Sequence, residues 1–83
     1  IVAGVSATQV TVGAGDIDKF FVDGIVRVHN YDYSIDSGIN GLKVLSISGN
    51  DIIVEDIGFV PDNTMVIDLI GFASDKGKPY VWL

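Results

Sequence analysis

Glycine residues interrupt this sequence so often that a long helix has little room to form. Ten glycines lie among 83 residues, about one in every eight, and the segments between them are rich in Val and Ile. Glycine weakens a helix interior, whereas β-branched side chains pack well on a pleated surface. No segment repeats apolar residues at helical spacing behind a capping residue. The pattern therefore predicts an all-β chain of short strands.

Six segments carry the alternation or the apolar runs that are typical of strands. They are residues 5–12, which hold a strand, a turn and a second strand, and residues 24–30, 40–48, 51–57, 64–72 and 78–83. Gly49-Asn50 predicts a tight turn that joins two of these segments into a hairpin. The expected fold is a small antiparallel barrel or sandwich of about six to seven strands. Residues 1–83 are expected to form a single small β domain, as a fragment or inserted domain of a longer chain.

Alternation also predicts which side chains face the core, because successive residues of a strand point to opposite faces. The inward set is Val10, Val12, Val26 and Val28. Arg27 and His29 are assigned to the opposite, solvated face. His29 is the single histidine, so one chain cannot assemble a Ser-His-Asp triad or a multi-histidine metal site. No catalytic role is assigned to it.

A faint internal repeat links two of the predicted hairpins. Residues 5–12 (VSATQVTV) match residues 47–54 (ISGNDIIV) in pattern, 42 positions later. If this repeat is real, the domain is a duplicated β-unit that closes on itself. The alternative is that any two hairpins share such a pattern. Both interpretations lead to the same antiparallel fold class.

The charge of the chain argues against several classes of partner. Eleven acidic residues against five basic ones give a net charge of −6, and the basic residues do not cluster. A phosphate-binding face needs a dense cationic stripe, and so does binding to an anionic membrane surface. Direct binding of nucleic acid or of a membrane is therefore not expected. The chain has no cysteine, which excludes disulfides and thiolate metal sites.

The acidic and glycine-rich loops do not predict chemistry. Asp16, Asp18 and Asp23 offer oxygen ligands, but they lack the spacing of a calcium-binding loop, and turn formation is the favoured role. The Gly-Ala-Gly segment at 13–15 lacks the spacing of a phosphate cradle and is predicted to be a loop with positive φ angles. No catalytic residue, metal ligand or cofactor is predicted, and the chain is expected not to be an enzyme.

Apolar and aromatic residues in unusual places indicate contact surfaces. Residues 64–70 and 80–83 are apolar on both faces, so such a strand either runs through the centre or meets another chain. The long loop at 30–41 carries two tyrosines, which either form a contact surface or cover one end of the barrel. The candidate contact residues are Phe20, Phe21, Tyr31, Tyr33, Tyr80 and Trp82.

Residues 21–28 (FVDGIVRV) and 40–44 (NGLKV) carry a family resemblance, which extends over about residues 5–62. Their order resembles a β-rich structural module of tailed-bacteriophage virion proteins, either the major tail (tube) protein or a capsid insertion domain. The chain departs from that pattern where Asp23-Gly24 replaces Gly-Asp, and it is shorter than a complete tube subunit, which indicates a fragment, an insertion domain or a small virion protein.

The resemblance implies a non-enzymatic module located in the virion. It would assemble by associating with copies of itself or with other virion proteins, through strand edges and apolar faces. An alternative from a different class stays open. In that alternative the chain is an SH3-like or OB-like domain that recognises a peptide or a carbohydrate, and Phe20, Phe21, Tyr31 and Tyr33 form the gripping surface.

Overall fold

The computed structural model describes residues 3–72 and confirms the all-β prediction. Its elements are β1 (Ala3–Ser6), β2 (Gln9–Thr11), a 3₁₀ turn η1 (Ile17–Lys19), β3 (Gly24–His29), β4 (Leu42–Ser48), β5 (Asp51–Val54) and β6 (Val66–Phe72). The short η1 is the one helical element of this range, and the sequence did not predict it. The strand predicted over 78–83 lies outside the described residues.

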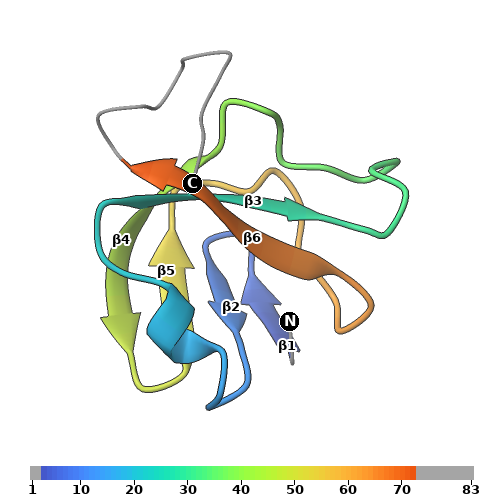
Figure 1. Cartoon of the computed structure of the whole chain (residues 1–83). Coiled ribbons are helices and arrows are strands. Elements are labelled where there is room, and N and C mark those ends of the chain that lie inside the picture. Colours follow the sequence, from blue (N-terminus) through green and yellow to red (C-terminus); the bar gives the residue numbers. More distant parts are fainter. Residues whose placement is uncertain (1–2, 73–83) are drawn as a thin grey trace.

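The six strands form one antiparallel sheet that curls into a half-barrel (Figure 1). Their order is β1-β2-β5-β4-β3-β6. The sheet turns within β4, whose first residues, Leu42 and Lys43, pair with β3, whereas Val44 and later residues pair with β5. A register irregularity follows Val44, and such a bulge bends a strand. As a result, β3 and β6 run across the direction of the other four strands, near one end of them (Figure 1).

The core lies inside this curl and contains every side chain that the sequence assigned inward. Val10, Val12, Val26 and Val28 are all buried. Removal of their apolar surface from water is the main driving force for folding. The remaining members of the buried cluster are Phe20, Leu42, Val44, Ile52, Val54, Ile57 and Ile67. The core therefore draws on five of the strands and on the connections between β2 and β3 and between β5 and β6.

The internal repeat has a geometric counterpart in the pairing of β2 with β5. Val10 pairs with Ile52, its own equivalent 42 residues later. The two backbone hydrogen bonds that flank this pair are also equivalent, because Val12 N–H donates to Asn50 O and Val54 N–H donates to Thr8 O, each at 2.9 Å. The two hairpins thus pair through their second strands about a pseudo-two-fold axis between Val10 and Ile52.

The glycine loops differ from their predicted conformations. Gly13 and Gly15 do not have positive φ angles, so that prediction was wrong. The segment instead forms a hydrogen-bonded turn that leads into η1, in which Asp16 N–H donates to Gly13 O at 2.9 Å. Glycines with positive φ lie elsewhere, at Gly38, Gly41, Gly49 and Gly58.

Gly41 is the glycine that packing most clearly requires. Its φ angle is +79°, and a Cβ atom there would overlap Cγ2 of Ile25, a side chain that is itself only 2% exposed. Gly49, in the β4–β5 turn, has a φ angle of +60° but no neighbouring atom within 4 Å of the same position. A comparison of substitutions at these two glycines therefore separates the cost of steric overlap from the cost of backbone strain.

Gly41→Ala is expected to lower the free energy of unfolding by about 3 kcal/mol or more, because overlap with a buried side chain adds to left-handed strain. Gly49→Ala, the matched control, is expected to cost about 1 kcal/mol from strain alone. Urea denaturation of both variants measures the difference. Equal losses would contradict the packing argument.

Candidate functional site

In the part of the chain that the structure describes, the half-barrel has an open seam between the two end strands of its sheet, β1 and β6. Within residues 3–72, β6 is hydrogen-bonded to β3 on one side, and β1 is paired with β2. The other edge of each strand has no strand partner in this range. Unpaired edges present backbone N–H and C=O groups that can pair with another chain. Residues 64–70 were predicted to carry apolar side chains on both faces, and β6 does so at this edge. Ile67 is buried on one face, and Val66, on the other face, is 42% exposed.

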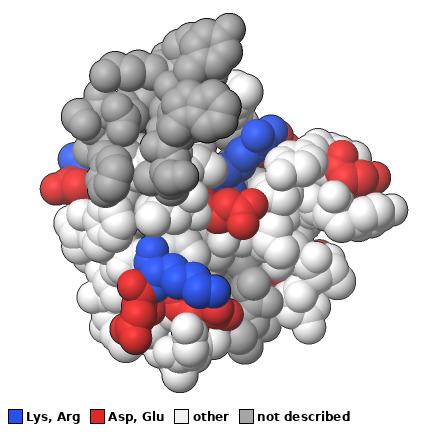
Figure 2. All heavy atoms as spheres, in the orientation of Figure 1, with Lys and Arg blue, Asp and Glu red and all other residues white. Residues whose placement is uncertain are grey.

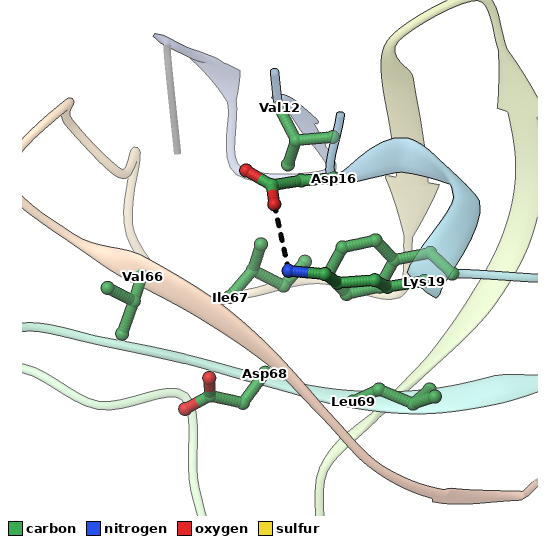
Figure 3. Close-up of a pocket in the computed structure, with 8 residues that line it drawn as sticks. Val12, Asp16, Lys19, Val66, Ile67, Asp68 and Leu69 are labelled. Carbon is green, nitrogen blue, oxygen red and sulfur yellow. Dashed lines mark hydrogen bonds and ion pairs between the residues drawn. The ribbon is translucent and has the colours of Figure 1, made fainter. Parts of the chain in front are cut away.

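A pocket of about 430 Å³ lies on the β6 side of this seam, between β6 and the connection that contains η1 (Figure 3). Four consecutive residues of β6 form one wall, so the pocket runs along the strand. Five of its lining side chains are apolar and three are charged. The lining residues are Val12, Asp16, Lys19, Phe20, Val66, Ile67, Asp68 and Leu69. The volume lies within the range of about 300–1,000 Å³ that is usual for ligand sites.

The charged groups lie on both sides of the pocket. Asp16 and Lys19 face each other across the first turn of η1, with Lys19 Nζ 2.9 Å from Asp16 Oδ1 (Figure 3). The hydrogen bond from Lys19, together with its positive charge, lowers the pKa of Asp16. Asp68 stands on the opposite side, on β6. The rim thus holds two carboxylates and one ammonium group.

His29 is buried at 5% exposure, so its assignment to a solvated face was wrong. Its Nε2 lies 2.7 Å from Asp68 Oδ2 and its Nδ1 lies 2.6 Å from Asn30 O. A backbone carbonyl and an ionised carboxylate only accept hydrogen bonds. The ring therefore donates to both partners when each of its nitrogens carries a proton. His29 links the pocket wall to the loop that follows β3.

Tyr33 covers the outer face of β3 and explains this burial. Its ring stacks on His29 with centroids 3.9 Å apart and an angle of 15° between the planes. The guanidinium carbon of Arg27 lies 4.6 Å from the centroid of the same ring. Tyr33 has a φ angle of +61°, a conformation that costs free energy for a residue with a Cβ. The stacking and cation–π contacts offset that cost.

Arg27 also binds the end of the 30–41 loop that contains Asp36. Its Nε donates to Asp36 Oδ1 at 2.9 Å, and its Nη2 donates to Asp36 Oδ2. Both side chains are largely buried, with 24% and 20% of their surface exposed. The hydrogen bonds from Arg27 lower the pKa of Asp36 to about 2. This bidentate pair is of the strong, charge-assisted kind.

The rest of the 30–41 loop is held by its own polar groups. Asn30 N–H donates to Ile35 O at 2.9 Å, and Ile35 N–H returns a bond to Asn30 Oδ1 at 3.1 Å. Ser37 exchanges two bonds with Val28, through its N–H and its hydroxyl. Tyr31 stays 88% exposed at the tip of this ordered loop. The two tyrosines therefore divide the predicted roles, since Tyr33 covers the barrel and Tyr31 faces solvent.

The structure does not gather the predicted aromatic residues on one surface. Phe20 is 9% exposed and belongs to the core, where it lines the pocket, whereas Phe21 is 38% exposed. Both precede β3, and Tyr31 and Tyr33 follow it. The six-residue strand between them spans about 20 Å. Tyr80 and Trp82 lie outside the described residues.

The charged surface carries no basic patch on the face drawn in Figure 2, where each blue group lies beside red ones. Each basic residue of the described range pairs with an aspartate. The pairs are Lys19–Asp16, Arg27–Asp36 and Lys43–Asp23. Residues 3–72 contain no group of three or more His, Asp or Glu side chains that could hold a metal ion. In the same range, no helix has the length and apolar character needed to cross a bilayer.

Comparisons with protein-family models, with curated proteins and with solved structures found no match to this chain.

Sequence reasoning missed the pocket and the His29–Asp68 pair. The pair joins residues 39 positions apart, and no local pattern reports such a distance. The one signal in the sequence is that a histidine on β3 and an aspartate on β6 lie on strands of similar length. Only the register of β3 with β6, which places Arg27 opposite Asp68, brings the two side chains together.

Asp36→Asn is expected to lower the free energy of unfolding at pH 7 by about 2 kcal/mol, the equivalent of a pKa reduced from 3.8 to about 2. Because the folded pKa is depressed, this stabilisation is present above the unfolded pKa and is lost as pH falls toward 2. The gap between wild type and variant should therefore close below about pH 4. Denaturant titrations from pH 7 to pH 2 measure it, with Asp18→Asn as the exposed control. A gap that stays constant would refute the ion pair as its source.

Tyr33→Ala is expected to cost about 1–2 kcal/mol of unfolding free energy, because it removes the stacking on His29 and the contact with Arg27. Tyr31→Ala, at the exposed tip of the same loop, is expected to change stability by less than about 0.5 kcal/mol. Thermal and urea denaturation compare the two variants. Similar losses would mean that Tyr33 does not fasten the loop.

Proposed function

We propose that this chain is a non-enzymatic assembly module that joins to copies of itself through the open edges of its half-barrel. The observation that carries the proposal is the seam, in which β1 and β6 each have a strand partner on one side only within residues 3–72. Natural proteins usually protect such edges. Here β6 carries the exposed Val66, and an apolar pocket lies beside it. These features favour contact with another chain.

Charge indicates which edges would meet. Two β6 strands pairing with each other would bring their Asp68 carboxylates close together, and like charges on neighbouring strands are destabilising. The residues of β1, Ala-Gly-Val-Ser, carry no charge. Pairing β6 of one copy with β1 of the next avoids the repulsion and continues the order of the sheet. Such a head-to-tail contact produces rings or open filaments rather than simple dimers.

The virion of a tailed bacteriophage is the setting that the resemblance of residues 21–28 and 40–44 suggests. Other virion proteins are then further candidate partners. The net charge of −6 would let such an assembly surround DNA without adhering to it. The alternative, a peptide- or carbohydrate-binding domain that uses four aromatic residues, receives less support because β3 separates those residues into two pairs.

Light scattering behind a sizing column, over a wide concentration range, tests self-association. The chain is expected to form concentration-dependent oligomers. Val66→Lys on β6 and Val5→Lys on β1 are each expected to suppress them, because a charged side chain on an edge strand blocks edge-to-edge pairing.

Leu45→Lys supplies the matched control. Leu45 is 50% exposed, close to 42% for Val66 and 56% for Val5, but it lies on β4, which is not an end strand of the sheet. Oligomers should therefore persist in this variant. A monomer at every concentration in the wild type would refute the proposal, and equal disruption by all three variants would assign the contact to apolar faces rather than to edges.

A further inference from the structure

The seam pocket has an apolar interior that is matched to a long side chain. Val12 and Phe20 line it from one side, and Ile67 and Leu69 line it from β6. A β1 strand from a second copy carries nothing larger than valine. Such a strand would leave most of the 430 Å³ unfilled. The pocket therefore suits an incoming strand with a larger side chain.

The rim of the pocket specifies the charge of that side chain. Asp68 uses Oδ2 for His29, and its Oδ1 has no hydrogen-bond partner among the described residues. Asp16 uses Oδ1 for Lys19, and its Oδ2 likewise has no partner in this range. Each aspartate thus has one carboxylate oxygen without a hydrogen-bond partner in this range, at the rim of the pocket. A long aliphatic stem that ends in a cation satisfies both parts of the pocket.

The described part of a second copy does not offer such a cation. Lys19, Arg27 and Lys43 each pair with an aspartate of their own chain. The whole chain carries a charge of −6. A basic partner of a different kind is therefore the better electrostatic match.

We propose that the pocket receives a Lys or Arg side chain from an extended segment of a basic protein, which adds as a strand to the edge of β6. The partner's backbone pairs with β6, and its cation lies at the rim of the pocket, where Asp16 and Asp68 supply negative charge. This inference rests on the open edge of the proposed function. It adds a second partner class at that edge, one that competes with a neighbouring copy and would cap a head-to-tail array.

A labelled seven-residue peptide that alternates Val and Lys, equal in length to β6, tests the proposal by fluorescence anisotropy. Counterparts carry Glu or norleucine in place of Lys. The lysine peptide is expected to bind, the norleucine peptide to bind more weakly and the glutamate peptide not at all. Binding is also expected to dissociate the oligomers seen by light scattering.

Charge-matched variants separate the pocket from general electrostatic attraction. Asp16→Asn is expected to weaken binding by about two- to fivefold, whereas Asp18→Asn, which removes the same charge from η1 outside the pocket lining, leaves it unchanged. Lys19→Gln is expected to strengthen binding because it frees Asp16. Lys43→Gln, with the same change of net charge, has no such effect. Thermal denaturation checks that each variant is folded.

Equal effects within each matched pair would overturn the proposal, and so would equal affinity for the glutamate peptide. The two proposals fail separately. Oligomers that Val66→Lys disrupts, without any peptide binding, leave self-assembly standing and refute the basic partner. Peptide binding to a chain that is monomeric at every concentration does the reverse.

Discussion

The pairing of β2 with β5 is the contact on which the rest of the molecule depends. It joins two hairpins through Val10 and Ile52, both fully buried. Because equivalent residues of the two hairpins face each other there, one short apolar pattern used twice builds the centre of the sheet. Apolar side chains on its inner face then recruit β3 and β6. This central pairing matters in a small domain without disulfides, because only its core and its partners supply its stability.

The second constraint is that β3 is buried on both faces. Its inner face meets the core, and its outer face is covered by the loop at 30–41, through Gly41 against Ile25 and Tyr33 against His29. Burial of polar groups there is compensated by pairing, since Arg27 forms an ion pair with Asp36 and His29 is hydrogen-bonded to Asp68. Buried charges without such partners would be strongly destabilising. The loop is therefore a structural cover for β3, and its own outer side, with Tyr31, Ile35 and Ile39, is exposed to solvent.

Asp68 connects the seam, which we propose as the assembly edge, to the covered face of β3. Asp68 contributes to the rim of the pocket with one oxygen and holds His29 with the other. The edge that we propose for assembly is consequently linked to the covered face of β3 by a single side chain. A partner that binds Asp68 would act on the loop as well, because His29 also bonds to Asn30.

The amino-acid sequence by itself determined the fold class, most strand positions, the Gly49-Asn50 turn and the inward side chains. These properties follow from a two-residue alternation and from local backbone preferences, which can be recognised within a few residues. The tertiary structure alone decided the burial of His29, the open seam, the pocket and the separation of the aromatic residues. Each of these depends on strand order and register between residues far apart in the chain, such as His29 and Asp68, and no local pattern encodes which distant strand becomes the neighbour.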